Sequence, residues 1–140
     1  MSLTNKLAVC RFNHEVIEAG EREAFDQLVA ANFINRSATP GTPNDRESLW
    51  RTFDQLLRPA FSGLTVTIEE QVAERDWVTT RKRISGIHSG TLMGIAPTGL
   101  TVAIEVIDMV RLENGQYVEH WGMNTLSNVI AQLQQTQNQP

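Results

Sequence analysis

Two side chains in the C-terminal third of the sequence could carry out acid–base chemistry. Asp108 lies in the apolar segment IEVIDMV, and His120 lies on the next predicted strand. A buried carboxylate is costly unless it is paired, and a histidine changes charge close to neutral pH. We predict His120 as the proton-transfer group and Asp108 as its orienting partner. The alternatives are a structural salt bridge from Asp108 to Arg111 or a partner subunit, and a core or interface role for His120.

A second set of residues is predicted to bind the ligand: His88, Asn35, Trp50, Val106, Val110 and Gly122. His88 lies between Gly86 and Gly90, whose missing side chains leave room for a ligand or for a close backbone. It could therefore line the mouth of a pocket or cap the adjacent loop. Asn35 could instead serve a turn, and Trp50 could pack in the core.

The sequence lacks the residue patterns that several other kinds of chemistry require. No two histidines and a carboxylate share a metal-ligand spacing, so we predict no metal site. No glycine-rich phosphate loop or nucleophile elbow is present, which disfavours nucleotide cofactors and nucleophilic hydrolysis. The net charge of −4 argues against nucleic acid as a partner. The one basic cluster, Arg81–Arg83, would be split between two faces of a strand, and we interpret it as solvated charge.

The composition is that of one globular domain spanning residues 1–140. The single cysteine, Cys10, cannot form an internal disulfide and is predicted to pack as a small side chain. The N-terminal residues lack the apolar core of a secretory signal, and no apolar run is long enough to cross a membrane. We therefore expect a cytoplasmic protein.

The first part of the chain is predicted to be helical. Apolar residues recur at helical spacing in three stretches, at residues 9–19, 25–29 and 49–57. Gly20 is a natural stop for the first helix. Asn44 and Glu47 have the arrangement of a capping box for the third helix, and Pro59 should end it by disfavouring helical geometry at Arg58.

After Gly63 the apolar period changes to two, which is typical of strands with one buried face. Besides a brief strand at 33–34, we predict strands starting at 64 and covering 77–88, 100–112 and 117–125. A final helix should carry the apolar residues between 126 and 133, followed by a polar, frayed tail at 134–140. Helices followed by long antiparallel strands define an α+β class. A single curved sheet with helices across its concave side would enclose a cone-shaped pocket.

Three sequence stretches together resemble a known family. They are G-x-H-x-G at 86–90, G-x-x-P-T-G at 94–99, and D-x-x-R at 108–111 followed by E-H-W at 119–121. In this order they are similar to the SnoaL-like polyketide and ester cyclases of the nuclear-transport-factor-2-like superfamily. The resemblance implies a cone-shaped α+β fold and a homodimer formed through the outer face of the sheet. It also implies ring closure by an intramolecular aldol reaction that uses no metal or cofactor.

The sequence departs from that family pattern at its acid–base positions. Gly122 stands where the cyclases have an acid–base Asp, Asp108 where they have a His, and Thr125 where a further Asp is common. We predict cofactor-free acid–base chemistry on a hydrophobic carbonyl or polyketide-like compound. The alternatives are a non-catalytic domain that binds such molecules and a purely dimerising module.

The register of the last hairpin decides which residues share the pocket. Asn114-Gly115 allows a two-residue loop, which places Asp108 opposite Trp121, or a three-residue loop with a bulge at Gly115. We favour the second, which pairs Leu112 with Gln116 and places Asp108 opposite His120. It puts three residues of each strand on one face: Val106, Asp108 and Val110, with Val118, His120 and Gly122. Apolar residues on both faces of these strands predict a homodimer.

Overall fold

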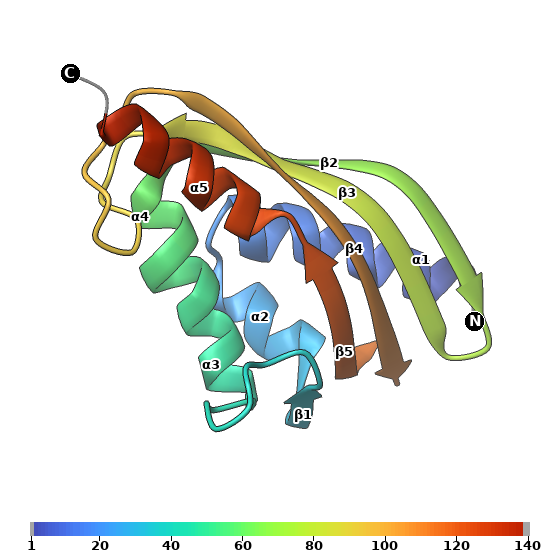
Figure 1. The fold of residues 1–140 in the computed structure, drawn as a ribbon. Coiled ribbons are helices and arrows are strands. Elements are labelled where there is room, and N and C mark those ends of the chain that lie inside the picture. Colours follow the sequence, from blue (N-terminus) through green and yellow to red (C-terminus); the bar gives the residue numbers. More distant parts are fainter. Residues whose placement is uncertain (1, 139–140) are drawn as a thin grey trace.

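The computed structural model describes residues 2–138 and shows a long curved sheet with helices on its concave side (Figure 1). The strands are β1 (Val29–Asn35), β2 (Phe61–Glu74), β3 (Trp77–His88), β4 (Thr101–Glu113) and β5 (Gln116–Asn124). The helices are α1 (Ser2–Arg11), η1 (Phe12–Glu18), α2 (Arg22–Leu28), α3 (Arg46–Arg51), η2 (Thr52–Leu57), α4 (Arg58–Ala60) and α5 (Leu126–Gln137). The predicted α+β class is confirmed.

The five strands of the sheet lie in the order β1-β5-β4-β3-β2. Only β1 runs parallel to its neighbour β5, and the other pairs are antiparallel. Residues on the inner face of the strands and on the facing sides of the helices form one hydrophobic core. The helices thus cover one face of the sheet, and no other element within residues 2–138 covers the opposite face (Figure 1).

The first helical stretch runs without a break through α1 and η1, and it ends where Gly20 was predicted to stop it. Gly20 has φ of +71° and lies against the side chain of Arg58. Arg58 donates to the carbonyl oxygens of Val16 and Ile17, at 2.8 and 3.3 Å. Since the last carbonyls of a helix have no partner within it, Arg58 caps this C-terminus from a distant helix.

Three predicted helix boundaries were wrong. The N-cap of α3 is Asp45 rather than Asn44, and its carboxylate accepts from the backbone N–H of Ser48 at 3.1 Å. Arg58 is helical, at φ −61° and ψ −42°, and the helix continues through Pro59 to Ala60. Pro59 lies in the first turn of α4, where the missing N–H costs little. At the C-terminus, α5 extends the expected helix to Gln137 and takes in much of the predicted tail; residues 139–140 lie outside the described part.

The β4–β5 hairpin closes with the two-residue loop that we had not favoured. Asn114 and Gly115 have φ of 51° and 76°, the positive values that a type I′ turn requires, and Glu113 pairs with Gln116. The predicted bulge is present, but at a different place.

The bulge lies at Val118, between the pairs Leu112↔Tyr117 and Arg111↔Glu119. The extra residue shifts the register, so that Val110 faces His120 and Asp108 faces Gly122. Asp108 and His120 therefore share a face as predicted, although they are diagonal neighbours and not directly opposed.

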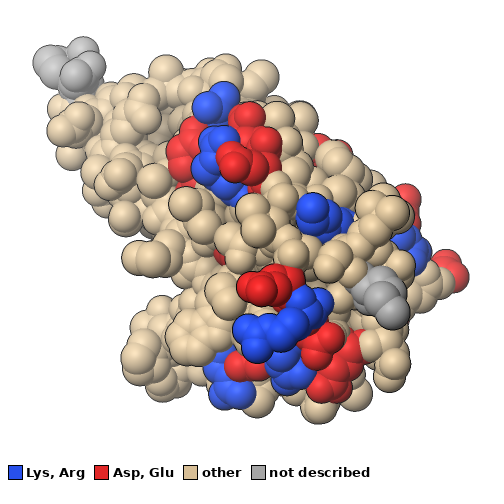
Figure 2. Space-filling view, turned by 90° about the vertical axis from the view of Figure 1, so that its right-hand side faces the viewer, with Lys and Arg blue, Asp and Glu red and all other residues tan. Residues whose placement is uncertain are grey.

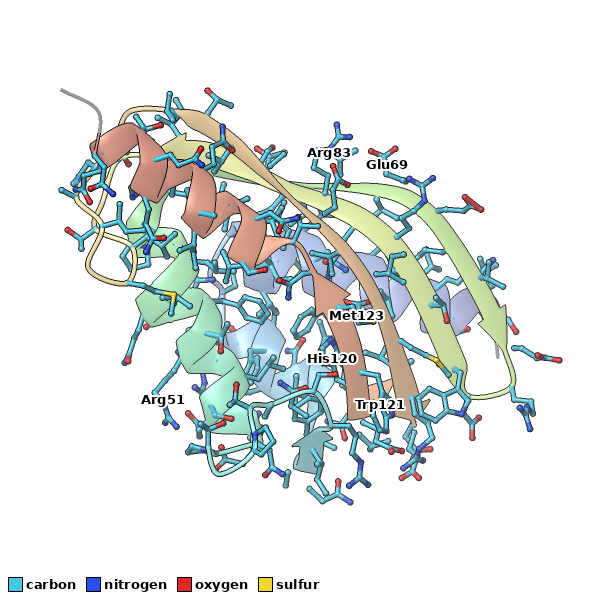
Figure 3. All side chains as sticks on the ribbon, in the orientation of Figure 1. Arg51, Glu69, Arg83, His120, Trp121 and Met123 are labelled. Atoms are coloured by element: carbon cyan, nitrogen blue, oxygen red, sulfur yellow. The ribbon has the colours of Figure 1, made fainter. Side chains whose placement is uncertain are left out.

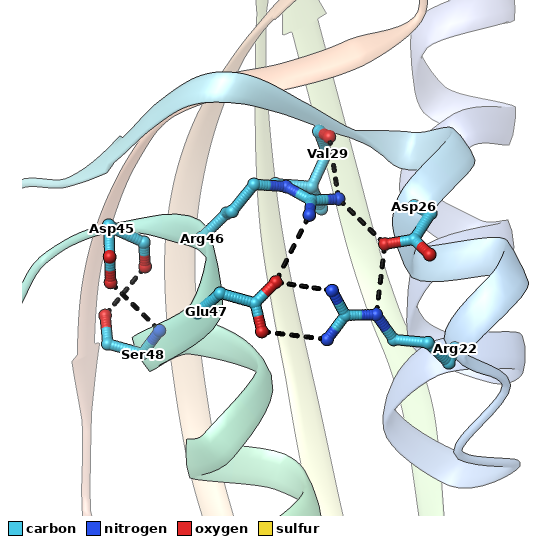
Figure 4. A network of polar contacts seen from close by, with 7 residues as sticks. All are labelled: Arg22, Asp26, Val29, Asp45, Arg46, Glu47 and Ser48. Atoms are coloured by element: carbon cyan, nitrogen blue, oxygen red, sulfur yellow. Dashed lines mark hydrogen bonds and ion pairs between the residues drawn. The ribbon is translucent and has the colours of Figure 1, made fainter.

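Charged side chains on the helical side form a network that ties α2 to α3 (Figure 4). Arg22 binds both Asp26, at 3.0 Å, and Glu47, and Arg46 binds Asp26 at 3.0 Å. The Arg22 guanidinium also lies over the ring of Trp50, 5.2 Å from its centroid. On the face drawn in Figure 2, basic groups lie beside acidic ones and do not form a stripe of one sign.

Candidate functional site

A cavity of about 210 Å³ lies between the concave face of the sheet and the helices. Its walls are mostly apolar and come from η1, from α3 with η2, and from the strands, among them Phe12, Leu49, Phe53, Ile84, Ile104 and Val106. Ser37, Thr52 and Asn124 are exposed and mark its mouth, whereas Lys82, Asp108 and Tyr117 are buried and form its floor. Such a cavity suits a largely apolar ligand with a few polar contacts at its deep end.

A chain of polar side chains crosses the floor of this cavity. Lys82 Nζ donates to Asn13 Oδ1 at 2.6 Å and lies 3.1 Å from Asp108 Oδ2. Asp108 Oδ2 lies 3.7 Å from His120 Nε2, and His120 Nδ1 lies 2.9 Å from Asn35 Oδ1. We call these five residues the polar chain: Asn13, Lys82, Asp108, His120 and Asn35. It joins η1, β3, β4, β5 and β1.

Local structure explains how these residues meet. Lys82 pairs with Val106 across the β3–β4 ladder, so Asp108, two residues further on, is its diagonal neighbour on the same face. Asn13 lies in the π-helical η1 and is fully buried, and its Nδ2 donates to the Val9 carbonyl at 2.8 Å. That bond turns its Oδ1 toward Lys82. Wider π-helical turns of this kind occur often at functional sites.

Asn35 fixes the proton arrangement of His120. The backbone N–H of Ser37 donates to Asn35 Oδ1 at 3.1 Å, so an oxygen must lie at that position. His120 Nδ1 faces the same oxygen and must therefore carry a hydrogen. The other ring nitrogen, Nε2, faces Asp108 Oδ2 at a distance longer than a hydrogen bond. His120 Nε2 is thus the ring nitrogen that can accept or release a proton in the cavity.

Asp108 is a carboxylate held in a buried place. Burial raises its pKa, but the charge of Lys82 and the nearby His120 outweigh burial, and the pKa lies below its ordinary value. Its second oxygen, Oδ1, is buried and has no hydrogen-bond partner in the described part of the chain. Tyr117, also on the floor, stays a neutral phenol because burial raises its pKa well above the usual range.

The structure brings five of the eight predicted site residues together at the cavity: Asn35, Val106, Asp108, His120 and Gly122. His120 lies between the sheet and the helices, whereas Arg83 and Glu69 lie on the outer side of the sheet (Figure 3). Asp108 pairs with Lys82, whereas Arg111, its predicted alternative partner, pairs with Glu113 and Glu119. Asn35 is the hydrogen-bonding partner of His120.

Three predicted ligand-binding residues do not line the cavity. Trp50 packs on Phe25, with ring centroids 5.2 Å apart, and Val110 is buried in the core. His88 is fully buried and accepts from the Thr98 backbone N–H at 3.2 Å, so it caps the loop before β4. A side chain at Gly90 would collide with the Pro59 carbonyl oxygen. The space beside His88 is therefore taken by the chain itself and not by a ligand.

Gly122 lies directly beside the His120 ring. A Cβ there would lie 2.8 Å from His120 Cε1, so the imidazole fills part of the space. The backbone N–H of Gly122 donates to Ser37 Oγ at 2.8 Å. Gly122 thus lets the His120 ring lie flat beside β5.

Sequence reasoning missed Lys82 and Asn13. Lys82 was interpreted as a solvated charge, yet only 4% of the residue is exposed. One signal was present in the alternation of β3, which places Lys82 on the same face as the buried Val78, Thr80 and Ile84. Asn13 had a weaker signal in its helical spacing, because it lies four residues from each of the buried Val9 and Ile17.

The sequence matches the family model of the SnoaL-like polyketide cyclases over residues 7–135. The chain belongs to the SnoaL-like polyketide cyclase family. Among curated proteins, no sequence matches it significantly.

Solved structures agree with the SnoaL-like assignment. IdmH of Streptomyces antibioticus, described as a candidate polyketide cyclase, is 28% identical, with a TM-score of 0.78 over 93% of this chain and 98% of its own. TsrD of Streptomyces laurentii is 20% identical, with a TM-score of 0.81 over 94% and 95% of the two chains. An LEH-like epoxide hydrolase of M. tuberculosis is 12% identical, with a TM-score of 0.70 over 96% and 92%. The last two likenesses show the fold alone.

Two further observations concern this SnoaL-like chain as a whole. Within residues 2–138, no helix is both long and apolar enough to cross a membrane. The same residues contain no cluster of three or more His, Cys, Asp or Glu side chains placed to hold a metal ion.

Proposed function

We propose that this SnoaL-like protein binds an apolar carbonyl compound of polyketide-like type and moves a proton on it, with His120 as the acid–base group. The observation that carries the proposal is the fixed orientation of His120: Asn35 holds Nδ1, and Nε2 faces the floor of an apolar cavity. A base must be able to reach the proton that it removes, and a cavity that excludes water strengthens every charge interaction within it.

The roles of the remaining residues follow from their contacts. Asn35 positions the ring and sets which nitrogen carries hydrogen. Asp108, 3.7 Å from Nε2, stabilises the imidazolium that forms when His120 takes up a proton. Lys82 keeps Asp108 ionised despite its burial. In this proposal Asp108 stabilises a charge and does not orient the ring.

The proposed step needs no co-reactant. A C–H bond next to the carbonyl breaks, its proton bonds to His120 Nε2, and the electron pair delocalises onto the carbonyl oxygen as an enolate. Return of the proton at another position gives an isomer. Alternatively, the enolate carbon attacks a second carbonyl of the same molecule: the new C–C bond closes a ring, the C=O π pair moves to oxygen, and this alkoxide takes the proton back from His120 Nε2, as in the cyclisation reactions of the family. We propose that neither a metal nor an organic cofactor takes part.

Deuterium exchange at the carbon next to a ketone tests the proposal. With 2-tetralone as a bicyclic probe in D₂O, we expect the protein to accelerate exchange and His120→Gln to lose about 10²–10⁴-fold of the acceleration. His14→Gln is the matched control, because His14 is exposed and pairs with Glu18 on the first helix. Equal exchange rates for His120→Gln and the unaltered protein would refute His120 as the acid–base group.

A second function deserves its own test because Asp108 is already neutralised by Lys82 and Gly122 supplies no carboxylate. In that case the protein binds the carbonyl compound without reacting with it. Saturable binding of 2-tetralone without any acceleration of exchange would favour this non-catalytic function over the enzymatic one.

A further inference from the structure

The Lys82–Asp108 ion pair has hydrogen-bonding capacity that the protein itself does not use. Both side chains line the cavity, and they are only 5% and 9% exposed. Their contacts with each other and with Asn13 fix their positions. Because both side chains line the cavity, a ligand bound there can contact the pair.

The count of donors and acceptors defines what is free. An ammonium group has three N–H donors. Lys82 Nζ donates to Asn13 Oδ1 and forms an ion pair with Asp108 Oδ2, which leaves at least one N–H for a further partner. Asp108 Oδ2 is shared between Lys82 and His120, but Asp108 Oδ1 is buried and has no partner in the described residues. A buried acceptor without a partner costs free energy, which a ligand donor would recover.

The charge of the pair restricts the ligand as well. Lys82 and Asp108 neutralise each other, so an ionic ligand would gain one favourable contact and meet one repulsive charge at a similar distance. A neutral ligand that presents a donor and an acceptor side by side satisfies both groups. The apolar residues above the pair would cover the rest of such a molecule.

We propose that the Lys82–Asp108 pair recognises a carbonyl oxygen next to an O–H or N–H, as in a secondary lactam or an enolised dicarbonyl compound. The carbonyl oxygen accepts from Lys82 Nζ, and the O–H or N–H donates to the Asp108 carboxylate, which lines the cavity. This recognition rests on the same cavity as the proposed function, but it does not depend on proton transfer by His120.

A pair of rigid probes tests the recognition. Quinolin-2(1H)-one carries C=O and N–H side by side on an apolar bicycle, and N-methylquinolin-2-one lacks only the donor. Hydrogen bonds to charged groups are strong, so we expect the first to bind at least about 10-fold tighter, as measured by fluorescence titration or calorimetry. Equal affinities in the unaltered protein would overturn the proposal.

Two variants localise the effect. In Lys82→Met/Asp108→Leu the preference for quinolin-2(1H)-one should fall to about onefold while N-methylquinolin-2-one still binds, because apolar residues can replace a buried ion pair without loss of the fold. Asp108→Asn is the second variant if the double variant does not fold, and its preference should drop several-fold. A preference that persists in either folded variant would overturn the proposal.

His120→Gln separates this proposal from the proposed function. Loss of deuterium exchange with the probe preference intact supports both. An intact preference in a protein that never accelerates exchange supports recognition by the pair and refutes the catalytic function. Accelerated exchange without a preference for quinolin-2(1H)-one refutes recognition by the pair and leaves the catalytic function supported.

Discussion

At the scale of single residues, the buried charges of Lys82 and Asp108 stabilise each other. Each charge would be costly on the apolar floor of the cavity, and the 3.1 Å contact between them offsets that cost only while both are present. Asn13 accepts a hydrogen bond from Lys82, and His120 Nε2 lies 3.7 Å from Asp108. Loss of one partner should therefore be much worse than loss of both.

Stability measurements on Lys82→Met test this dependence. The substitution leaves the Asp108 charge buried without its cation, so we expect the free energy of unfolding to fall by about 3–5 kcal/mol in urea titrations. The double variant Lys82→Met/Asp108→Leu should recover most of the loss. Arg81→Met is the control, because the exposed Arg81–Glu70 pair is expected to contribute at most about 1 kcal/mol. A double variant as unstable as Lys82→Met would contradict the account.

The pH dependence of stability should carry the signature of Asp108. Burial raises the pKa of Asp108, but the charge of Lys82 and the nearby His120 lower it by more than burial raises it. The folded state therefore binds this proton less readily than the unfolded state does. The stabilisation is then fully present above the unfolded pKa of about 3.9 and is lost as pH falls through the lower folded value.

The measurement is the free energy of unfolding between pH 6 and pH 2, compared with Asp108→Asn. We expect the unaltered protein to lose stability more steeply below about pH 4 than the variant, because the variant has no carboxyl group to titrate at this site. Glu70→Gln, on the exposed part of β2, serves as the control. Parallel curves for the unaltered protein and Asp108→Asn would show that folding does not lower the pKa of Asp108.

At the scale of elements, the β5 strand shows where sequence reasoning succeeds and where it stops. The favoured register predicted that Asp108 and His120 share a face, and Asn114-Gly115 predicted a hairpin, although the favoured loop length was wrong. The bulge at Val118 could not be placed, because an ordinary valine fits a bulge as well as a regular pair. Register along a whole strand depends on that one residue.

Contacts between residues distant in sequence also decided the outcome at Lys82 and in the helices. A lysine on a strand is usually solvated. The burial of Lys82 is explained by Asp108 and Asn13, which are distant in sequence and adjacent in space. Gly20 could be identified as a helix stop because its conformation is a local property. Pro59 misled us because the helix it enters is continuous with another.

Deletion of Val118 tests the role of the bulge. Val118 is the unpaired residue between Leu112↔Tyr117 and Arg111↔Glu119, so its deletion should give a regular ladder in which His120 still faces Val110. We expect the deletion variant to keep His120 in the cavity and to retain binding of quinolin-2(1H)-one. Val118→Ala keeps the bulge and removes the same buried side chain, so it should also retain binding, at some cost in stability. Loss of binding in the deletion variant but not in Val118→Ala would show that the bulge itself shapes the cavity.

At the scale of the whole molecule, the uncovered face of the sheet is the main feature that one chain does not explain. Four large apolar residues gather there on neighbouring strands: Ile107, Met109, Trp121 and Met123. Ile107 is paired with Met123 and Met109 with Trp121. We call these four the outer patch. Beside it, Arg83 binds Glu105 at 2.8 Å, so charged residues flank the patch.

An apolar outer patch with charged neighbours is typical of a protein–protein interface. The patch lies on β4 and β5, the strands that also carry Asp108 and His120 on their inner face, so cover on the outer face would hold both strands in place. We therefore predict a homodimer in which the outer patches of two chains meet. Gel filtration with light scattering, at micromolar concentration, should give twice the mass of one chain.

A charged outer patch should abolish this association. Ile107→Lys/Met123→Lys places two like charges on each patch, and opposing copies would have to bury them, so we expect a monomer. Leu3→Lys is the matched control, because Leu3 is 70% exposed and lies on α1, away from the patch. The Leu3→Lys variant should remain a dimer. If the monomeric variant still binds quinolin-2(1H)-one as the unaltered protein does, the cavity is complete within one chain and the dimer serves stability. A monomeric mass for the unaltered protein would refute the predicted assembly.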